Sequence, residues 1–519
     1  MMGRNINFKN LFKIVIFFPV IFYFGKRSFI AFDEGFYALQ ARWILEKGNW
    51  IVPLWWDEYV LDRTIGIQFL MAKSQELFGQ NFFSIYLPST ISSIIMLFVT
   101  YKLHEELFDK KYAIISPLIL STTYLWFDYS HLATQDIIYS CLVTIGIFSL
   151  INTIFEVNKF YFFLFGIWIR LAFMMITFLV AVPLASLTPY FLKTKNNFLF
   201  NKYFWIGLLF GFTPYLYWTY LIDSYLERNI IFYLFEKFNI LANKNSFTNP
   251  FYYYFWNMPL TFLPWSFFSI IGLFLNIFSN KNQKFILAYF PLTFILIISF
   301  FSTKTPYYPL QISAILSLNA YQGISYLFNS KNYRLTTVFI TSKLIPLFAF
   351  SCAFVYYFFL RNSLNFNFKE SLCLTLGLIL FALSWSLINK RNNLKKVLIN
   401  LIIGPYLLTF LLLQSGLFSD RSRELRLTME YLSSLDILQK HEIKVDKSSI
   451  RDEESQSKII RISLLTPHLG EGIDSFKNLK NPDYVWTTLS KKTQFEDENF
   501  QIIYDDDILS PWKLIKKVK

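Results

Sequence analysis

The sequence predicts an all-α polytopic membrane protein that ends in a small α/β domain. Of its 519 residues, 54% are hydrophobic and only 16% are charged, against roughly 25% charged in an ordinary soluble domain. Apolar runs near twenty residues long recur along the chain, and a run of that length crosses the hydrocarbon layer as a helix. With 17 Gly and 3 Cys, the composition excludes a collagen and a disulfide scaffold.

The apolar runs predict about thirteen membrane crossings. They lie near 11–25, 85–103, 112–127, 137–155, 160–175, 176–192, 203–222, 259–279, 285–301, 306–328, 335–360, 371–389 and 397–415. We expect the two short runs within 160–192 to form a hairpin that turns near Met174 and Met175. The first run is expected to be a retained helix rather than a cleaved signal peptide, because no small-x-small cleavage site follows it.

The net charge of +14 predicts the orientation of the chain in the membrane. Lys and Arg gather in every second break between the apolar runs, as they do on the cytoplasmic side of spanning helices. This alternation favours the hairpin and a cytoplasmic N-terminus, in a protein of the cell (inner) membrane. Nucleic acid is not an expected partner, because the basic residues form no stripe on a soluble face.

Three parts of the chain are expected outside the lipid on the extracytoplasmic face. They are a first loop at 26–84, a second loop at 223–258 and the tail from residue 416. We therefore divide the chain into a transmembrane domain, 1–415, and an extracytoplasmic α/β domain, 416–519.

Both outer regions have predicted secondary structure of their own. In the first loop, 38–45 and 66–77 have the composition of short interfacial helices. In the tail, 423–438 has the pattern of an amphipathic helix and 458–465 that of a strand.

Charged side chains interleaved with tryptophans make the first loop the candidate site. The charged residues are Asp33, Glu34, Asp57, Glu58, Asp62 and Arg63, and the tryptophans are Trp43, Trp50, Trp55 and Trp56. Amphipathic aromatics prefer the headgroup level, so we expect this loop on the bilayer surface. A carboxylate can take the proton of a hydroxyl or amine, and a guanidinium can bind a phosphate through two parallel hydrogen bonds. Both groups suit sugar transfer from a polyprenyl phosphate, although composition alone does not separate this function from transport.

A series of short motifs follows in order over roughly residues 30–310. They are Asp33-Glu34-Gly35 with Gly48-Asn49-Trp50-Ile51-Val52-Pro53, Tyr59-Val60-Leu61-Asp62-Arg63, Gly79 with Leu87-Pro88-Ser89, Ala133-Thr134-Gln135-Asp136, Leu263-Pro264-Trp265-Ser266, and Ser302-Thr303-Lys304 with Tyr307-Tyr308-Pro309. In order and spacing they resemble the ArnT-like and protein O-mannosyltransferase-like membrane glycosyltransferases of the GT-C fold. The resemblance implies a GT-C-like arrangement of the helices.

The resemblance also implies an enzyme that moves a hexose or pentose, with inversion, from a polyprenyl-phosphate donor to an acceptor on the extracytoplasmic face. It implies that Asp33, with Glu34 beside it, is the catalytic base or orients the acceptor. The acceptor, which could be lipid A, a glycan, a protein or another lipid, stays open, as does the length of the lipid carrier.

For the donor phosphate, the resemblance implies binding by Arg63, with Lys304 as a second contact. Asp62 would be a metal ligand or would orient Arg63, and Asp136 could pair with Arg63. These two acids are supporting residues of the implied site.

Several positions depart from the family pattern. Phe36 stands where many relatives have Arg, Thr64-Ile65 replaces a common Pro-Pro pair, Tyr86 replaces an Arg, and Met175-Ile176 replaces a Thr-Lys pair. The 223–258 loop contains no His, so a His-containing metal site is not supported. Whether a divalent metal ion takes part stays open.

Simpler interpretations of these residues stay open as well. Arg63 could reach lipid phosphates in general, Lys304 could mark a helix end, and His131 could be an interfacial polar tip. Arg170 lies inside an apolar run, where it is either a donor-phosphate contact or an anchor that reaches the interface. The alternative function is a membrane transporter or lipid flippase, and a third possibility is a scaffold that acts through the tail.

Overall fold

A computed structural model describes residues 15–518 except 57, 62, 156–157, 194–200, 228, 244–247, 362, 365, 475, 477–478 and 489–499. The chain forms two compact units. The helical unit comprises 1–25, 62–64 and 89–418, and the loop–tail unit comprises 26–61, 65–88 and 419–519. The loop–tail unit thus combines most of the first loop with the tail, whereas the domain boundary at 415/416 stays a prediction.

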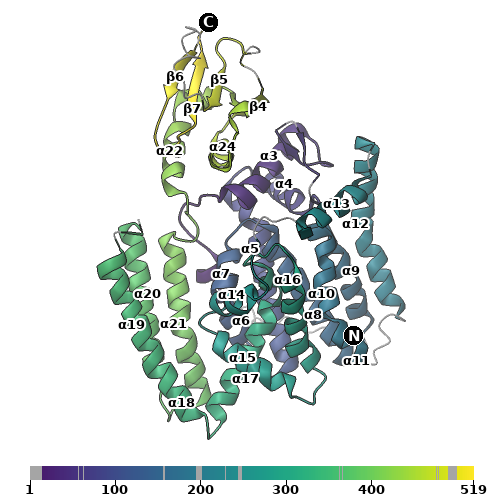
Figure 1. The fold of residues 1–519 in the computed structure, drawn as a ribbon, viewed down its shortest axis with the longest axis vertical. Coiled ribbons are helices and arrows are strands. Elements are labelled where there is room, and N and C mark those ends of the chain that lie inside the picture. The colour runs from purple at the N-terminus through teal and green to yellow at the C-terminus, as the bar shows by residue number, and fades with distance from the viewer. Residues whose placement is uncertain are drawn as a thin grey trace. The chain divides into compact units, whose positions relative to one another are not determined.

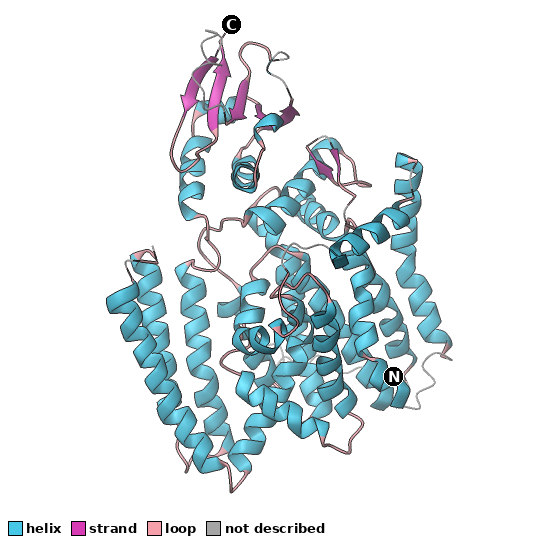
Figure 2. Cartoon of the chain, viewed as in Figure 1, coloured by secondary structure: helices cyan, strands magenta, loops and turns pink. Residues whose placement is uncertain are grey.

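The helical unit consists of helices and short helical turns joined by loops (Figure 2). Its helices are α2 (Phe18–Ile21), α5 (Phe82–Leu107, whose first residues belong to the other unit), α6 (Ile115–Ser121), α7 (Tyr124–Ser130), α8 (Gln135–Phe155), α9 (Lys159–Ile176), α10 (Ala181–Ser186), α11 (Thr188–Lys193), α12 (Lys202–Leu226), α13 (Ile230–Asn243), α14 (Tyr253–Thr261), α15 (Ser266–Ile277), α16 (Phe290–Phe300), α17 (Ser313–Asn329), α18 (Arg334–Phe339), α19 (Ile345–Val355), α20 (Phe368–Ser386) and α21 (Leu394–Ser415). Short turns η2 (Thr177–Val180), η4 (Phe285–Tyr289), η5 (Tyr308–Ile312), η6 (Ile340–Leu344) and η7 (Tyr356–Leu360) extend or join them. In Figure 1, α19, α20 and α21 run side by side.

Six helical stretches of the described chain are long and apolar enough to cross a membrane, or up to seven if one bent pair counts as a single span. They are Phe82–Leu107, Gln135–Thr153, Lys159–Lys193, Arg334–Leu360, Phe368–Ser386 and Leu394–Ser415. The chain is therefore a multi-pass membrane protein, whereas the total of thirteen crossings and the orientation stay predictions. Of the first predicted span, 11–25, residues 11–14 lie outside the described residues, and the described part contains only the four-residue helix α2.

The stretch Lys159–Lys193 is continuous by composition, but its chain reverses direction. Helix α9 ends at Ile176, and Thr177 has a φ of 56°. The rings of Phe165 on α9 and Phe191 on α11 lie 6.4 Å apart between centroids, whereas a straight helix would separate these residues by about 39 Å. The predicted hairpin is thus confirmed, with its turn at Thr177, close to the expected position.

Two predicted single spans are wrong in detail because the helix is interrupted. The run 259–279 is divided between α14 and α15, which meet at an angle of 118°. Pro264 lies in the break, where a residue without an N–H cannot continue the helical hydrogen bonds. The run 112–127 is divided between α6 and α7, and Thr123 begins α7 by accepting a hydrogen bond from the Trp126 amide at 3.3 Å.

A glycine allows the close approach of α9 and α12. A Cβ atom on Gly207 would lie 2.1 Å from the carbonyl oxygen of Phe163. Such a contact with backbone cannot be relieved by a rotamer change, so only glycine fits here. Small residues commonly permit this kind of backbone packing between membrane helices.

In the loop–tail unit, the first loop supplies η1 (Ala31–Gly35), α3 (Phe36–Lys47), the paired strands β1 (Leu54–Trp55) and β2 (Glu58–Tyr59), and α4 (Gly66–Phe78). Helices α3 and α4 confirm the two helices predicted at 38–45 and 66–77. The tail supplies α22 (Arg423–Ser433), α23 (Asp436–Lys440), η8 (Lys447–Ser449), α24 (Glu453–Leu465) and the strands β3 (Ile443–Asp446), β4 (Leu469–Ile473), β5 (Tyr484–Thr487), β6 (Phe500–Tyr504) and β7 (Lys513–Lys517).

The five tail strands form one mixed sheet in the order β4-β3-β5-β7-β6. The β3 strand is parallel to β4 and β5, while β7 is antiparallel to β5 and β6. One core joins the tail to the first loop, because Trp43 of α3 and Trp56 pack in the same buried cluster as Met429, Trp486 and Trp512. The first loop is therefore part of the hydrophobic core of this unit.

The strand predicted at 458–465 is wrong, because these residues form the second half of α24. Ser455, Ile459, Ile462 and Ser463 are all buried, and their spacing is that of one helical face. Asp452 accepts a hydrogen bond from the Ser455 amide at 2.7 Å in a capping box that starts the helix. The β-branched residues of this run favour a strand. The Asp452 cap and the burial of one helical face stabilise the helix instead.

Candidate active site

The acid pair of the first loop, Asp33 and Glu34, lies in the tight turn η1, directly before α3. Asp33 is exposed, and its backbone has φ 55° and ψ −85°. A non-glycine residue rarely adopts a positive φ, and such strain persists only where the surroundings enforce it. Asp33 therefore combines solvent access with an enforced backbone conformation, as expected of a residue with a functional role.

Glu34 lies in a different environment from its neighbour. It is only 1% exposed, and its carboxylate accepts a hydrogen bond from the Ile30 amide at 2.8 Å. In the same unit the Tyr86 hydroxyl donates to the Ser28 carbonyl at 3.4 Å, and the Arg27 guanidinium lies 4.4 Å from the centre of the Tyr86 ring. Glu34 thus holds the turn together, while its neighbour Asp33 is an exposed residue.

Helix α24 supports this turn from within the same unit. A Cβ atom on Gly35 would lie 2.7 Å from Cγ2 of Ile460 and 3.4 Å from Cδ1 of Leu464. A side chain at position 35 would therefore force the side chains of α24 to shift away from the turn. The sequence offered no signal for this contact, because Gly35 and Ile460 are remote along the chain.

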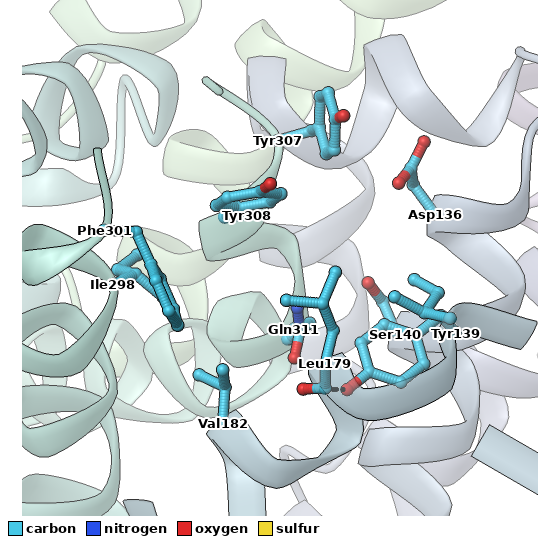
Figure 3. Close-up of a pocket in the computed structure, with 11 residues that line it drawn as sticks. Asp136, Tyr139, Ser140, Leu179, Val182, Ile298, Phe301, Tyr307, Tyr308 and Gln311 are labelled. Carbon is cyan, nitrogen blue, oxygen red and sulfur yellow. Dashed lines mark hydrogen bonds between the residues drawn. The ribbon is translucent and has the colours of Figure 1, made fainter. Parts of the chain in front are cut away.

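A small, mostly apolar pocket with a few polar side chains in its wall lies in the helical unit (Figure 3). Its lining includes Asp136 and Ser140 of α8, the tyrosines Tyr307 and Tyr308, and Gln311 of η5. Its free volume of about 30 Å³ has room for one or two water molecules. Of the predicted site residues, Asp136 thus lies in a pocket wall, in the first turn of α8, where the helix dipole favours a carboxylate.

Two pocket residues that the sequence did not indicate each have a buried polar atom that could form a hydrogen bond with a ligand or water. Within the described part of the chain, the Ser140 hydroxyl and the Gln311 amide oxygen are buried without a hydrogen-bond partner. Tyr139 also lines the pocket, and its hydroxyl donates to the Leu179 carbonyl at 3.3 Å (Figure 3). Single polar residues inside apolar runs were the available signal for Ser140 and Gln311.

Lys304 lies in the loop between α16 and η5, and this loop also contains the pocket residues Phe301 and Tyr307. Its side chain is buried, and its ammonium donates to the carbonyl of Asn249 at 2.9 Å and to that of Phe301 at 2.6 Å. Burial lowers the pKa of this ammonium. Lys304 therefore joins two loops of the helical unit, a structural role that the sequence did not indicate.

Replacing Lys304 by Met is expected to destabilise the helical unit by about 1–3 kcal/mol, because it leaves two partly buried carbonyl groups without their donor. The melting temperature of the purified protein measures this loss. Lys281→Met is the matched control, since Lys281 is exposed. A Lys304→Met protein that melts with the unaltered one would show that these two hydrogen bonds contribute little.

The remaining predicted residues fall into three cases. Arg63 is half-buried and belongs to the helical unit with Asp136 and Lys304, whereas Asp33 and Glu34 belong to the loop–tail unit. Asp57 and Asp62 lie outside the described residues. The convergence of all these groups in one pocket therefore stays a prediction.

His131 and Arg170 are engaged near their own helices. The Nδ1 atom of His131 lies 2.7 Å from the Phe127 carbonyl oxygen, at the end of α7. The Arg170 guanidinium lies 3.8 Å from the centre of the Phe212 ring. Among the described residues, no group of three or more His, Cys, Asp or Glu side chains is placed to hold a metal ion, so no reaction step is assigned to a metal here.

The fold of this protein is similar to that of a solved membrane protein. The chain superposes on the crystal structure of ArnT from Cupriavidus metallidurans bound to undecaprenyl phosphate with a TM-score of 0.77, over 98% of this chain and 97% of that one, at 15% identity. The apo form of that protein gives a TM-score of 0.75 at 14% identity. The chain is thus ArnT-like, with the GT-C fold that its motifs predicted.

Sequence comparison agrees with this class. Residues 62–218 match the family described as dolichyl-phosphate-mannose-protein mannosyltransferase. A protein of Aquifex aeolicus without an assigned function is 23% identical over 313 residues, which are 57% of this chain and 60% of that protein. The undecaprenyl phosphate-alpha-4-amino-4-deoxy-L-arabinose arabinosyl transferase of Shewanella sediminis is 30% identical over 132 residues, 25% of this chain and 24% of that enzyme. The chain thus aligns with less than two thirds of the length of either relative.

Proposed function

We propose that this protein is an inverting glycosyltransferase that takes its sugar from a polyprenyl-phosphate donor on the extracytoplasmic face of the membrane. The observation that carries the proposal is the ArnT-like fold along 98% of the chain. The related crystal structure contains undecaprenyl phosphate, and the related enzymes are named for a sugar donor of this type. The proposed acceptor is a hydroxyl or amine of a lipid, glycan or protein.

The proposed reaction forms one bond and breaks one. The acceptor oxygen or nitrogen attacks the anomeric carbon of the sugar from the face opposite the phosphate. The bond between this carbon and the phosphate oxygen breaks, and polyprenyl phosphate leaves with the bonding electrons. Asp33 takes the proton of the acceptor as general base. A single displacement of this kind inverts the anomeric configuration.

The exposure of Asp33 and its positive φ support this role, because a base must reach the acceptor and hold a fixed direction. Glu34 is proposed to keep the turn in shape rather than to exchange protons, since its carboxylate is buried and hydrogen-bonded. Arg63 is proposed to bind the donor phosphate in two parallel hydrogen bonds. Asp62 and Asp136 are proposed to orient Arg63, and Lys304 to hold its loop near the donor.

The test is a transfer assay with the purified protein in lipid vesicles and a synthetic polyprenyl-phosphate sugar. Because the acceptor is unidentified, an envelope extract from a strain that lacks the gene supplies it, and mass spectrometry identifies the glycosylated product. We expect a new glycoside together with free polyprenyl phosphate. Accumulation of the donor in the vesicle lumen, without a new glycosidic bond, would identify a transporter instead.

A further inference from the structure

Arg42 of α3 has a buried guanidinium that makes four hydrogen bonds within the loop–tail unit. One terminal nitrogen donates to the carbonyls of Ser463 at 3.2 Å and Thr466 at 2.8 Å, and the other donates to that of Pro467 at 2.8 Å. Its Nε donates to the Glu46 carboxylate at 2.6 Å. The residue is 6% exposed, so these contacts form inside the unit rather than at its surface.

Ser463 lies in the last turn of α24, Thr466 is the residue that caps this helix, and Pro467 follows the cap. The last carbonyls of a helix have no partner within the helix, and they carry the negative end of its dipole. A guanidinium offers five N–H donors in a planar fork, which can serve several such oxygens at once. Arg42 therefore caps α24 with a side chain that comes from the first loop.

The preceding turns of the same helix touch the turn η1. Ile460 and Leu464 of α24 lie against Gly35, and Ile460 is completely buried. Arg42 itself follows η1 by two turns of α3. Helix α24 is thus held at its end by Arg42 and packed at its middle against the turn that contains Asp33.

The position of Asp33 depends on this support, because a strained backbone keeps its conformation only when its surroundings enforce it. We propose that Arg42 is a positioning residue for Asp33, and that it acts by fixing α24 of the tail against η1. This inference rests on the proposed function of Asp33. It assigns the tail a task in the reaction, which is to hold the base of the first loop in place.

Two variants and one control test the proposal. Arg42→Ala removes all four hydrogen bonds, while Arg42→Lys keeps a cation that can serve part of them. Lys444→Ala is the control, because Lys444 lies on β3 of the same tail rather than on α24. Its ammonium forms an ion pair with the Asp483 carboxylate, with 3.0 Å between nitrogen and oxygen. For each purified, folded protein, we would measure kcat, the KM for the donor, and hydrogen–deuterium exchange of the amides in 31–37 and 460–467.

We expect Arg42→Ala to lower kcat by about 10- to 100-fold, the effect of a small displacement of a catalytic group. The KM for the donor should stay within about twofold of the original, and exchange should become faster in both segments. Arg42→Lys should recover part of kcat, and Lys444→Ala should keep both kcat and the exchange of 31–37.

Two results would overturn the inference: an unaltered kcat in folded Arg42→Ala, or unaltered exchange of 31–37 in that variant. A purely structural role would lower the yield of folded protein without changing the kcat of the folded fraction. If the unaltered protein transferred no sugar, the proposed function would fall and the positioning role with it. The exchange measurement would then still show whether Arg42 anchors the turn.

Discussion

Asp33→Asn is expected to reduce the rate of sugar transfer by about 10³-fold while the protein stays folded and inserted in the membrane. A general base contributes a factor of roughly 10² to 10⁴ to a reaction rate, and an amide cannot take the proton. Asn has nearly the shape of Asp, and the two residues share an unusual tolerance of positive φ. The substitution should therefore preserve the turn that places residue 33.

The measurement is the initial rate of product formation at saturating donor, with the melting temperature as a check on folding. Glu76→Gln is the matched control, because Glu76 is an exposed acid on α4. Its carboxylate forms an ion pair with the Lys73 ammonium, with 2.7 Å between oxygen and nitrogen. Full activity in Asp33→Asn would remove Asp33 from the reaction. Loss of activity in both variants would show that the assay responds to surface charge rather than to a base.

Arg63→Ala is expected to lower kcat/KM by about 10²-fold or more, because the charge that develops on the departing phosphate loses its partner. Arg63→Lys should retain more activity than Arg63→Ala. A lysine keeps the positive charge but gives up the second of two parallel hydrogen bonds. If activity falls in the order arginine, lysine, alanine, the two steps separate the effect of the second hydrogen bond from the effect of the positive charge.

Binding of polyprenyl phosphate gives this prediction a readout that does not depend on the acceptor. Product inhibition by polyprenyl phosphate should weaken in Arg63→Ala and stay unchanged in Arg391→Ala, which replaces an exposed arginine. Equal inhibition of the Arg63→Ala and unaltered proteins would show that another group binds the phosphate. Arg63 would then be an interfacial anchor, the simpler interpretation that the sequence left open.

The features that the sequence predicted correctly are encoded locally. Length and apolarity of a run decide whether it can cross a membrane, and six stretches of the described chain meet that criterion. The hairpin within 160–192 followed from run lengths and charge alternation, and the contact between Phe165 and Phe191 confirms it. The first-loop helices followed from helix-forming residues, and the fold class followed from the order of short motifs.

The features that the sequence did not predict depend on partners far away in the chain. Hydropathy gave no sign of the break between α14 and α15, and the β-branched run at 458–465 suggested a strand. Glu34 was predicted to lie beside the catalytic Asp33, and Lys304 to be a second phosphate contact after Arg63. Their burial and their hydrogen bonds give them structural roles that residue type cannot reveal.

The sequence by itself determined that this is a multi-pass membrane protein of ArnT-like fold, because apolar length, charge placement and motif order are properties of single segments. Only the tertiary structure decided how the first loop is supported. The Arg42 guanidinium and the Thr466 carbonyl are 424 residues apart in the chain and 2.8 Å apart in space. Burial of a shared core with Trp43 and Trp486 brings them together, and no local pattern encodes that encounter.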